Sequence, residues 1–583
     1  MGKAPPIILP LGVVALVLAV GTYVRRQHGA TTLSFAASAD AAALDSAAAL
    51  EAAAPPAESE RPHILFVIAD QHRHDAIGGG LMPAGLTPAL DRLRREGATF
   101  ASHYTSTPSC TPSRAAILTG RKPWHHGMLG FGDIALAYPY AELPRCLARV
   151  GYDTVSVGKN HFYNEMSGGE NPGHGFAKRY TYDGIIAEFD AYDRWFNASL
   201  PGRDPLATGI AEFGEELAFD DYRGAPYAYD EQFHPTAWVG ATARGALRRH
   251  AASNASAPLF LKASFHRPHS PYDPPARVLA KFEDPAACVV PGADMSVDGW
   301  DARFAQGRNY TDLPYGGAPD VAMFCGDIGA KHVRKTRGAY LASVAFVDEH
   351  LGLVLDELDA LGMADRTFVL YVGDHGDMQG DHYLWRKGFP FEGSAHVPLI
   401  VRWPEAYVPL AASRGVALAF VTEHRDLLPT LLDAAGAAGS LEPREAVDGR
   451  SLLDLLRGDN ATWRSWVDLE HDPGTLGAVC FDNTTNHWNA LTDGSTTKYV
   501  FDAHTLEEFL FDLPGERENL AAAQPERLAL WRRRLVAHFE DEKRGDAWVK
   551  GGVLQRRTGS ILYSPFYPAD VPGRAFDGAP RAT

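Results

Sequence analysis

Side chains that could hold an ion or move a proton follow four largely apolar stretches of the chain, each at the point where the stretch ends. In chain order, these side chains are Asp70 and Gln71, then Lys159 and His161, then His266 and His269, and finally Asp374 and His375. Chance charges in a surface loop would explain any one of these groups. Four repeats of the same arrangement instead favour one shared site, in which acidic, basic and imidazole groups meet.

The four stretches themselves predict strands of a parallel sheet buried on both faces. They are Ile64–Ile68, Thr154–Val157, Leu259–Phe265 and Phe368–Val372. Helical patterns lie between them, including one with an apolar face from Leu341 to Leu358 that ends at Gly362. Because ligands of open α/β sheets bind beyond the carboxyl ends of the strands, we expect the polar side chains to converge there.

A cysteine lies between the first two predicted strands in a setting that favours reactivity. Cys110 is followed by Thr-Pro-Ser-Arg, and Pro112 suits the first turn of a helix. Cys110 would then lie just before the amino terminus of that helix, where free amide groups and the helix dipole favour an anion. Cys110 is therefore a candidate nucleophile, and the alternative is a small buried hydrophobic residue.

The motif Cys-x-Pro-Ser-Arg at Cys110, followed by Leu-Thr-Gly-Arg at Leu118, resembles the signature of the type I sulfatases of the alkaline-phosphatase-like superfamily. In that family the cysteine is oxidised after translation to formylglycine. The resemblance extends in matching order over nearly all of residues 61–530 and includes a smaller-domain motif at Glu507–Ala521. It implies an α/β fold with a large mixed, mostly parallel sheet flanked by helices, and a smaller C-terminal α+β subdomain.

The resemblance also implies a role for each site residue. A formylglycine hydrate made from Cys110 would attack the sulfur of a sulfate monoester, and its second hydroxyl would then expel the sulfate. The implied ligands of a divalent metal are Asp70, Gln71, Asp374 and His375. Among the other implied catalytic residues, Arg114 would contact the hydrated aldehyde and the metal ligands, and Lys159 and Lys387 would neutralise sulfate oxygens. His161 would accept the hydroxyl proton, and His269, alone or with Lys387, would protonate the leaving oxygen.

Two departures from the family pattern bear on the metal and on the reaction. We expect one calcium ion, because oxygen ligands dominate the implied set. Gln71 stands where many relatives have a second Asp, and His375 offers nitrogen, so the preference for calcium over magnesium or manganese is loosened. The same two features resemble phosphodiester and phosphonate monoester hydrolases of the superfamily, which are the alternative enzymes. A noncatalytic secreted glycoprotein is the third interpretation, and the intact set of site residues argues against it.

Composition and charge limit the partners. The 583 residues are 45% hydrophobic, enough for a large core, and the net charge of −17 argues against nucleic acid as a partner. The expected partners are a small-molecule or oligosaccharide sulfate ester and, during maturation, a formylglycine-generating enzyme.

The amino terminus predicts entry into the secretory pathway. Residues 6–24 carry no charge and span about 19 residues, as in a signal peptide or a signal anchor that would attach the protein to a membrane. Five Asn-x-Ser/Thr sequons favour glycosylation: Asn197, Asn254, Asn309, Asn460 and Asn483. We expect a secreted, lysosomal or membrane-anchored protein with a lumenal catalytic domain.

The predicted organisation has five parts. They are a signal segment at 1–30, an Ala-rich linker at 31–60, the catalytic domain at 61–465, the smaller subdomain at 466–550 and a tail at 551–583. The odd number of cysteines leaves at least one without an intrachain disulfide partner. Cys288 with Cys325, and Cys146 with Cys480, are the pairs that could form disulfides.

Overall fold

The computed structural model describes most of the chain after residue 60. The residues described are 61–568 except 163–172, 185–189, 210–216, 218–220, 222, 254–255, 285–287, 296, 298, 306, 308–322, 406–413 and 473–486. The predicted signal segment and linker therefore lie outside the described residues.

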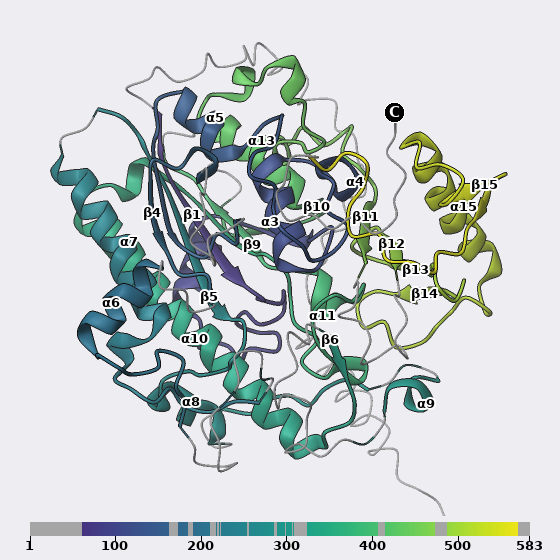
Figure 1. The fold of residues 1–583 in the computed structure, drawn as a ribbon, viewed down its shortest axis with the longest axis horizontal. Coiled ribbons are helices and arrows are strands. Elements are labelled where there is room, and N and C mark those ends of the chain that lie inside the picture. The colour runs from purple at the N-terminus through teal and green to yellow at the C-terminus, as the bar shows by residue number, and fades with distance from the viewer. Residues whose placement is uncertain are drawn as a thin grey trace, which may run out of the picture. The chain divides into compact units, whose positions relative to one another are not determined.

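A mixed sheet of eight strands forms the centre of the described structure (Figure 1). Its spatial order is β10 (Val416–Glu423), β2 (Ala98–Tyr104), β9 (Leu399–Arg402), β7 (Thr367–Gly373), β1 (His63–Asp70), β5 (Leu259–Pro268), β3 (Asp153–Gly158) and β4 (Lys178–Thr181). Every pairing is parallel except those of β9, which runs antiparallel to both β2 and β7. The predicted fold class, a mixed and mostly parallel sheet, is confirmed.

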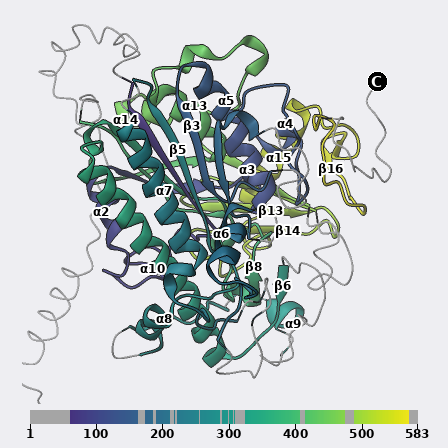
Figure 2. The same cartoon turned by 60° about the vertical axis from the view of Figure 1, so that its left-hand side comes forward.

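Alternate side chains of β1 enter two separate cores, because successive residues of a strand point to opposite faces. Phe66 packs into a core with the helices α5 (Leu143–Arg149), α13 (Leu427–Ala434) and α14 (Leu452–Arg457). Val67 packs into the other core, with α2 (Pro88–Glu96), α7 (Pro235–Ala252) and α10 (Ala330–Ala360). Figures 1 and 2 show α7 and α10 on one face of the sheet and α5 and α13 on the other.

Shorter elements complete the large domain. They are α3 (Cys110–Thr119), α4 (Pro123–His126), α6 (Ala191–Ser199), α8 (Ala276–Glu283), α9 (Trp300–Phe304), α11 (Glu392–Ala395) and the two-stranded sheet of β6 (Met323–Cys325) and β8 (Leu384–Arg386). Within the described residues, α10 alone is long and apolar enough to cross a membrane, but 78% of its apolar window is buried. It is therefore a core helix.

A second sheet, antiparallel throughout, follows in the chain. Its strands are β11 (Val467–His471), β12 (Trp488–Thr492), β13 (Thr497–Asp502) and β14 (Glu508–Asp512). The helix α15 (Pro525–Asp541) packs against it, and a short hairpin of β15 (Val549–Lys550) and β16 (Val553–Leu554) follows. Trp488 and Val500 share an apolar core with Phe389 and Phe391 of the large domain. The smaller α+β part is thus present and packs directly on the large one.

Cys288 and Cys325 do not form the disulfide that the sequence suggested as a possibility. Cys288 has a free thiol, so it is not joined to Cys325. Cys146 is also a buried free thiol, packed in the core beside Leu147, and Cys480 lies outside the described residues.

Candidate active site

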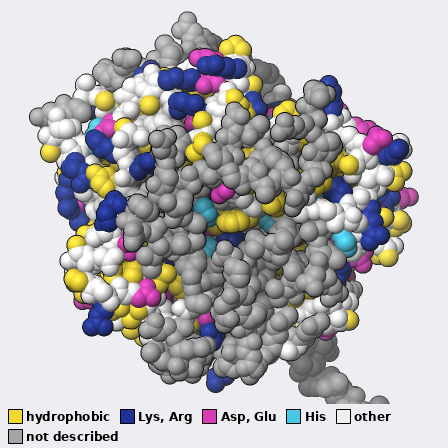
Figure 3. Space-filling view, viewed as in Figure 1, with side chains coloured by type: hydrophobic (Ala, Val, Ile, Leu, Met, Phe, Trp, Pro, Cys, Tyr) yellow, Lys and Arg dark blue, Asp and Glu magenta, His cyan; other side chains and the backbone are white. Residues whose placement is uncertain are grey.

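The side chains that follow the predicted strands do meet at one edge of the large sheet. Asp70 ends β1, while Lys159, His269 and Asp374 follow β3, β5 and β7 within two residues. These four strands are mutual neighbours and run parallel, so their carboxyl ends coincide. Figure 3, which has the same view as Figure 1, shows a hollow near the centre of the molecular surface, with histidine and hydrophobic side chains inside it.

Cys110 is the first residue of α3 and is only 1% exposed. Its Sγ lies 2.9 Å from Lys387 Nζ, 3.1 Å from His375 Nε2 and 3.7 Å from Asp70 Oδ1. Burial raises the pKa of the Cys110 thiol, but the charges of Lys159, Lys387 and His375 outweigh it and hold that pKa well below its ordinary value. The position thus stabilises an anion, as expected of a nucleophile at a helix amino terminus.

Two carboxylates and an imidazole nitrogen surround the thiol. Ligand atoms of Asp70, Cys110, Asp374 and His375 all lie within 4.8 Å of one another, and all four residues are buried. His375 Nδ1 lies 3.0 Å from the Gly376 carbonyl oxygen, which assigns the proton of a neutral ring to Nδ1 and leaves Nε2 free to face the carboxylates. The cluster is a candidate metal centre.

The electrostatics of the two carboxylates fit a bound cation. Burial and the neighbouring charge of Asp70 raise the pKa of Asp374. Burial also raises the pKa of Asp70, but nearby positive charge, that of Lys159 foremost, outweighs it and brings the net value below the ordinary one. A divalent cation between the two carboxylates would relieve the repulsion that raises the pKa of Asp374.

The side-chain amide oxygen of Gln71 is available to bind a metal. Its backbone is in the left-handed region, with φ of 67°, and its N–H donates to Asp374 Oδ1 at 3.0 Å. Its Nε2 donates to Asp377 Oδ2 at 2.6 Å, so the opposite side of the amide is the carbonyl oxygen. Oε1 is buried without a hydrogen-bond partner among the residues that the structure describes. An orphaned buried acceptor beside two carboxylates fits a metal ligand.

Arg114 lies one helical turn after Cys110 and contacts the carboxylate Asp374. Both Nε and Nη2 lie 2.9 Å from Asp374 Oδ2, while Nη1 donates to the Lys159 carbonyl at 2.9 Å and to Ser264 Oγ at 3.1 Å. The expected contact of Arg114 with the implied metal ligands is therefore present. Its hydrogen bonds go to these groups rather than to the Cys110 thiol.

The remaining predicted side chains lie around the thiol. Lys159 Nζ forms an ion pair with Asp70 and lies 3.9 Å from Cys110 Sγ. Lys387 Nζ lies 3.0 Å from His269 Nε2. Burial and the Lys387 charge lower the pKa of His269 to about 4, so His269 is neutral at pH 7. The His161 side chain also contributes to the lowered pKa of Cys110. The structure thus brings all ten predicted site residues together.

Three residues that the sequence did not single out hold this set in place. Asp377 orients Gln71, Ser264 accepts from Arg114, and Asp183 accepts from the backbone N–H groups of Asn160 and His161 at 2.7 and 3.0 Å. Asp377 lies three residues after Asp374, in the polar stretch that follows the predicted strand Phe368–Val372, so a signal existed for it. Ser264 and Asp183 follow no pattern in the sequence that points to their partners.

Comparison with known proteins decides the family. A family model described as Sulfatase matches residues 62–437, more than half of the chain. The chain belongs to the sulfatase family. An arylsulfatase of Clostridium perfringens is 31% identical to this sulfatase over 505 residues, covering 83% of this chain and 96% of the relative. A choline-sulfatase of Rhizobium meliloti is 28% identical, covering 88% and 93% of the two chains.

The fold of this sulfatase is also found in solved structures. That of a phosphonate monoester hydrolase from Silicibacter pomeroyi superposes with a TM-score of 0.67 at 24% identity, covering 83% of this chain and 96% of the other. This likeness concerns the fold alone. The family places the protein among the sulfuric ester hydrolases, as the Cys110 motif predicted.

Substituting Asp377→Asn tests the metal site. The new amide can donate to Gln71 Oε1, which would turn the Gln71 N–H groups toward the carboxylates, so the affinity for a divalent cation should fall about 10- to 100-fold. The measurement is a calorimetric titration of metal-stripped protein with Ca²⁺.

Tyr272→Phe is the matched control. It removes the other side-chain donor to Asp377 Oδ2, 2.5 Å away, and leaves the hydrogen bond from Gln71 Nε2 to Asp377 in place. Its affinity for Ca²⁺ should stay within about threefold of the native value, well inside the loss expected for a displaced ligand. A folded Asp377→Asn protein that binds Ca²⁺ as tightly as the native protein would contradict the assignment of Gln71 Oε1 as a ligand.

Proposed function

We propose that this sulfatase hydrolyses sulfate monoesters of small molecules or oligosaccharides with a hydrated formylglycine made from Cys110. The observation that carries the proposal is the position of Cys110 Sγ, at the start of a buried helix and within 3.1 Å of both Lys387 Nζ and His375 Nε2. A hydroxyl in place of this sulfur would lie among cations on one side and the carboxylate cluster on the other. That is the environment in which a weak nucleophile can attack an anionic ester.

The chain's own residues supply what an anionic ester needs. Lys159 and Lys387 place two ammonium groups beside the reacting atom, and these attract the sulfate oxygens and stabilise the charge that develops on them. One hydroxyl of the aldehyde hydrate forms a bond to sulfur and releases its proton, while the bond from sulfur to the ester oxygen breaks. Lys387, whose Nζ lies 2.9 Å from Cys110 Sγ, takes up the released proton as it gives its own to the ester oxygen. The alcohol or phenol then leaves with a proton, and the sulfate stays on the formylglycine oxygen.

The proton for the leaving oxygen comes from the pair of Lys387 and His269. Lys387 is a donor only, so His269 Nε2 accepts its hydrogen bond, and His269 Nδ1 lies 2.9 Å from the Ser270 carbonyl. A neutral His269 arranged in this way has no proton on Nε2. The proton at this position therefore belongs to the ammonium of Lys387, and His269 holds that ammonium in place.

His161 completes the cycle as a base. Its side chain interacts with the Cys110 position, where the second hydroxyl of the hydrate would stand. Removal of the proton from this hydroxyl forms the carbonyl double bond, and the carbon–oxygen bond to sulfate breaks. Sulfate leaves, the aldehyde is regenerated, and one water rehydrates it.

Substituting Cys110→Ala tests the nucleophile. Without a side chain that can become formylglycine, kcat for an aryl sulfate should fall by about 10³-fold or more. The measurement is release of the phenol, together with the mass of the Cys110 peptide, which formylglycine lowers relative to cysteine. Matched aryl sulfate and aryl phosphonate esters give the selectivity, and faster cleavage of the phosphonate would favour the alternative hydrolase. A native protein that hydrolyses the sulfate with an unmodified thiol would contradict the mechanism.

The metal centre would be held by Asp70, Gln71, Asp374 and His375. We propose calcium, because three of these four residues offer oxygen. The bound cation would polarise the reacting hydroxyl and a sulfate oxygen.

Metal removal gives a direct test of this proposal. A chelator should abolish aryl sulfate hydrolysis, and calcium should restore it at a lower concentration than magnesium or manganese does, as measured by the initial rate during titration. Restoration by manganese or magnesium alone would overturn the choice of calcium. Full activity after verified metal removal would overturn the metal centre itself.

We also propose that the chain enters the secretory pathway and is glycosylated there. Among the five sequons, Asn197 near the end of α6 and Asn460 beyond α14 lie in the described residues, and both are exposed. The other three sequons and the uncharged segment 6–24 lie outside the described residues.

The glycosylation proposal is tested on protein secreted from a eukaryotic cell. Treatment with an N-glycosidase should lower its mass, and peptide mass spectrometry should find the conversion to Asp at Asn460 and Asn197. Asn519 is not in a sequon and serves as the internal control. Secreted protein that is unmodified at both positions would contradict the proposal.

A further inference from the structure

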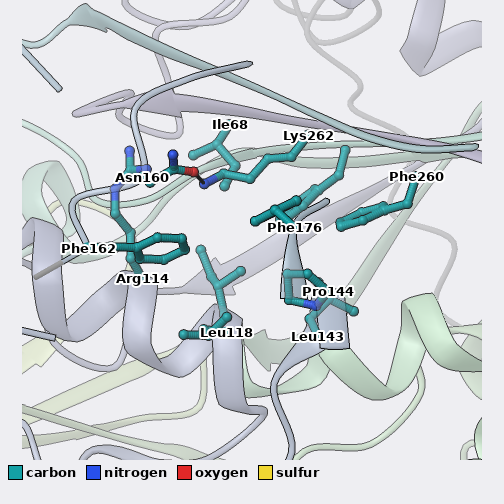
Figure 4. A pocket seen from close by; sticks show the side chains of 12 residues that line it. Ile68, Arg114, Leu118, Leu143, Pro144, Asn160, Phe162, Phe176, Phe260 and Lys262 are labelled. Atoms are coloured by element: carbon teal, nitrogen blue, oxygen red, sulfur yellow. Dashed lines mark hydrogen bonds between the residues drawn. The ribbon is translucent and has the colours of Figure 1, made fainter. Parts of the chain in front are cut away.

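A small buried cavity lies directly behind the active site, on the face of the sheet that α3 and α5 cover (Figure 4). Its volume is about 30 Å³, enough for one water molecule. Its walls are mainly apolar, with three polar exceptions. The polar residues are Arg114, Asn160 and Lys262. Two of these belong to the active-site motifs, but Lys262 takes no part in the chemistry proposed above.

Lys262 lies on strand β5 of the large sheet and is only 7% exposed. Its Nζ donates to Asn160 Oδ1 at 2.7 Å and lies 5.5 Å and 5.7 Å from the ring centres of Phe162 and Phe176. Burial of an ammonium group is unfavourable, and contact with aromatic faces compensates only part of that cost. An apolar residue would fill this cavity at less cost, so the lysine needs another explanation.

The partner of Lys262 sits in the turn that carries two catalytic side chains. Figure 4 shows the Lys262 side chain extending along the cavity to the Asn160 amide. Asn160 Oδ1 also accepts from Ser156 Oγ at 2.6 Å, so two donors fix the amide. The residues on either side of Asn160, Lys159 and His161, both interact with Cys110. The turn thus directs its middle side chain into the cavity and its outer two to the thiol.

The turn has an unusual backbone that requires such support. Gly158 has φ of 85°, and a Cβ there would lie 2.0 Å from the Ser264 carbonyl oxygen. His161 has φ of 60°, which is uncommon for a residue with a side chain. Glycine adopts this backbone freely, but the left-handed backbone at His161 is strained and persists only where surrounding contacts hold it. Those contacts are Asp183 at the backbone, Arg114 at the Lys159 carbonyl and Lys262 at the Asn160 side chain.

We propose that Lys262 is a positioning residue for the sulfatase reaction, which acts through Asn160 to hold Lys159 and His161 against the reacting atom. The proposal rests on the roles assigned above to Lys159 and His161. It predicts that removal of the ammonium leaves the protein folded and metal-bound but slows the chemical step.

Lys262→Met tests this inference, because methionine matches the length of the lysine stem without its charge. kcat for an aryl sulfate should fall at least about tenfold, since small displacements of catalytic groups are costly. The melting temperature should not fall, because an apolar side chain suits the cavity. Ca²⁺ affinity should also be unchanged, because Lys262 makes no contact with the carboxylate cluster in the described interactions.

Leu143→Met is the matched control, since Leu143 lines the same cavity and lies on α5 rather than at the turn or in the Cys110 motif. Its kcat should stay within about twofold of native, well short of the loss expected when a catalytic group moves. Asn160→Ala should lower kcat as Lys262→Met does, and the double variant should be no slower than either single variant, because both remove the same link. Asn160→Asp retains an acceptor for Lys262 and should restore most of the rate.

The outcomes separate this inference from the proposed function. Native kcat in folded Lys262→Met or in Asn160→Ala overturns the inference, and so do losses that multiply in the double variant. If Lys262→Met does not fold, the kcat of Asn160→Ala alone decides whether the inference stands. Native kcat in Lys159→Ala would instead overturn the role proposed for Lys159, whatever the Lys262 variant does.

Discussion

Charge balance among buried side chains is the constraint on which the rest of the site depends. Asp70 contacts Lys159 and His375 and lies within 4 Å of the Cys110 sulfur. Its carboxylate thus joins the ammonium group of Lys159 to the candidate metal centre. Neither carboxylate could be buried without partners, because an uncompensated buried charge costs several kcal/mol. Arg114 provides the second link, since its guanidinium joins Asp374 to the turn at Lys159.

The small C-terminal sheet takes part in the same arrangement by supporting the segment that carries Lys387. Trp488 Nε1 donates to the Gly388 carbonyl at 2.9 Å, directly beside Lys387. Lys498 Nζ donates to Glu392 Oε1 at 2.6 Å, and the Glu392 N–H donates to Glu516 Oε2 at 2.8 Å. The motif around Glu516 thus has a structural explanation. It holds Glu392, at one end of the segment 387–392, while Lys387 at the other end contacts the Cys110 thiol.

Much of the fold and the convergence of the candidate site residues could be predicted from the sequence because both depend on local patterns. Apolar runs that end in polar side chains mark strand ends, and Cys110 before Pro112 marks a helix start. The groups that orient the site could not be predicted in this way. Asp183 acts 22 residues beyond His161 along the chain, and Lys262 acts 102 residues beyond Asn160, through hydrogen bonds that no sequence period encodes. The candidate bridge between Cys288 and Cys325 was wrong, since cysteine counts carry no distances.

The burial of α3 means that the proposed oxidation of Cys110 must precede folding. Every residue from Cys110 to Thr119 is buried, and the sulfur sits beneath side chains contributed by strands and loops that are synthesised much later. An oxidising enzyme that must grip this segment can do so only while the polypeptide is still unfolded. A host cell that lacks such an enzyme would therefore deliver a well-folded molecule with its thiol sealed inside, and no treatment of the finished product short of unfolding would expose it.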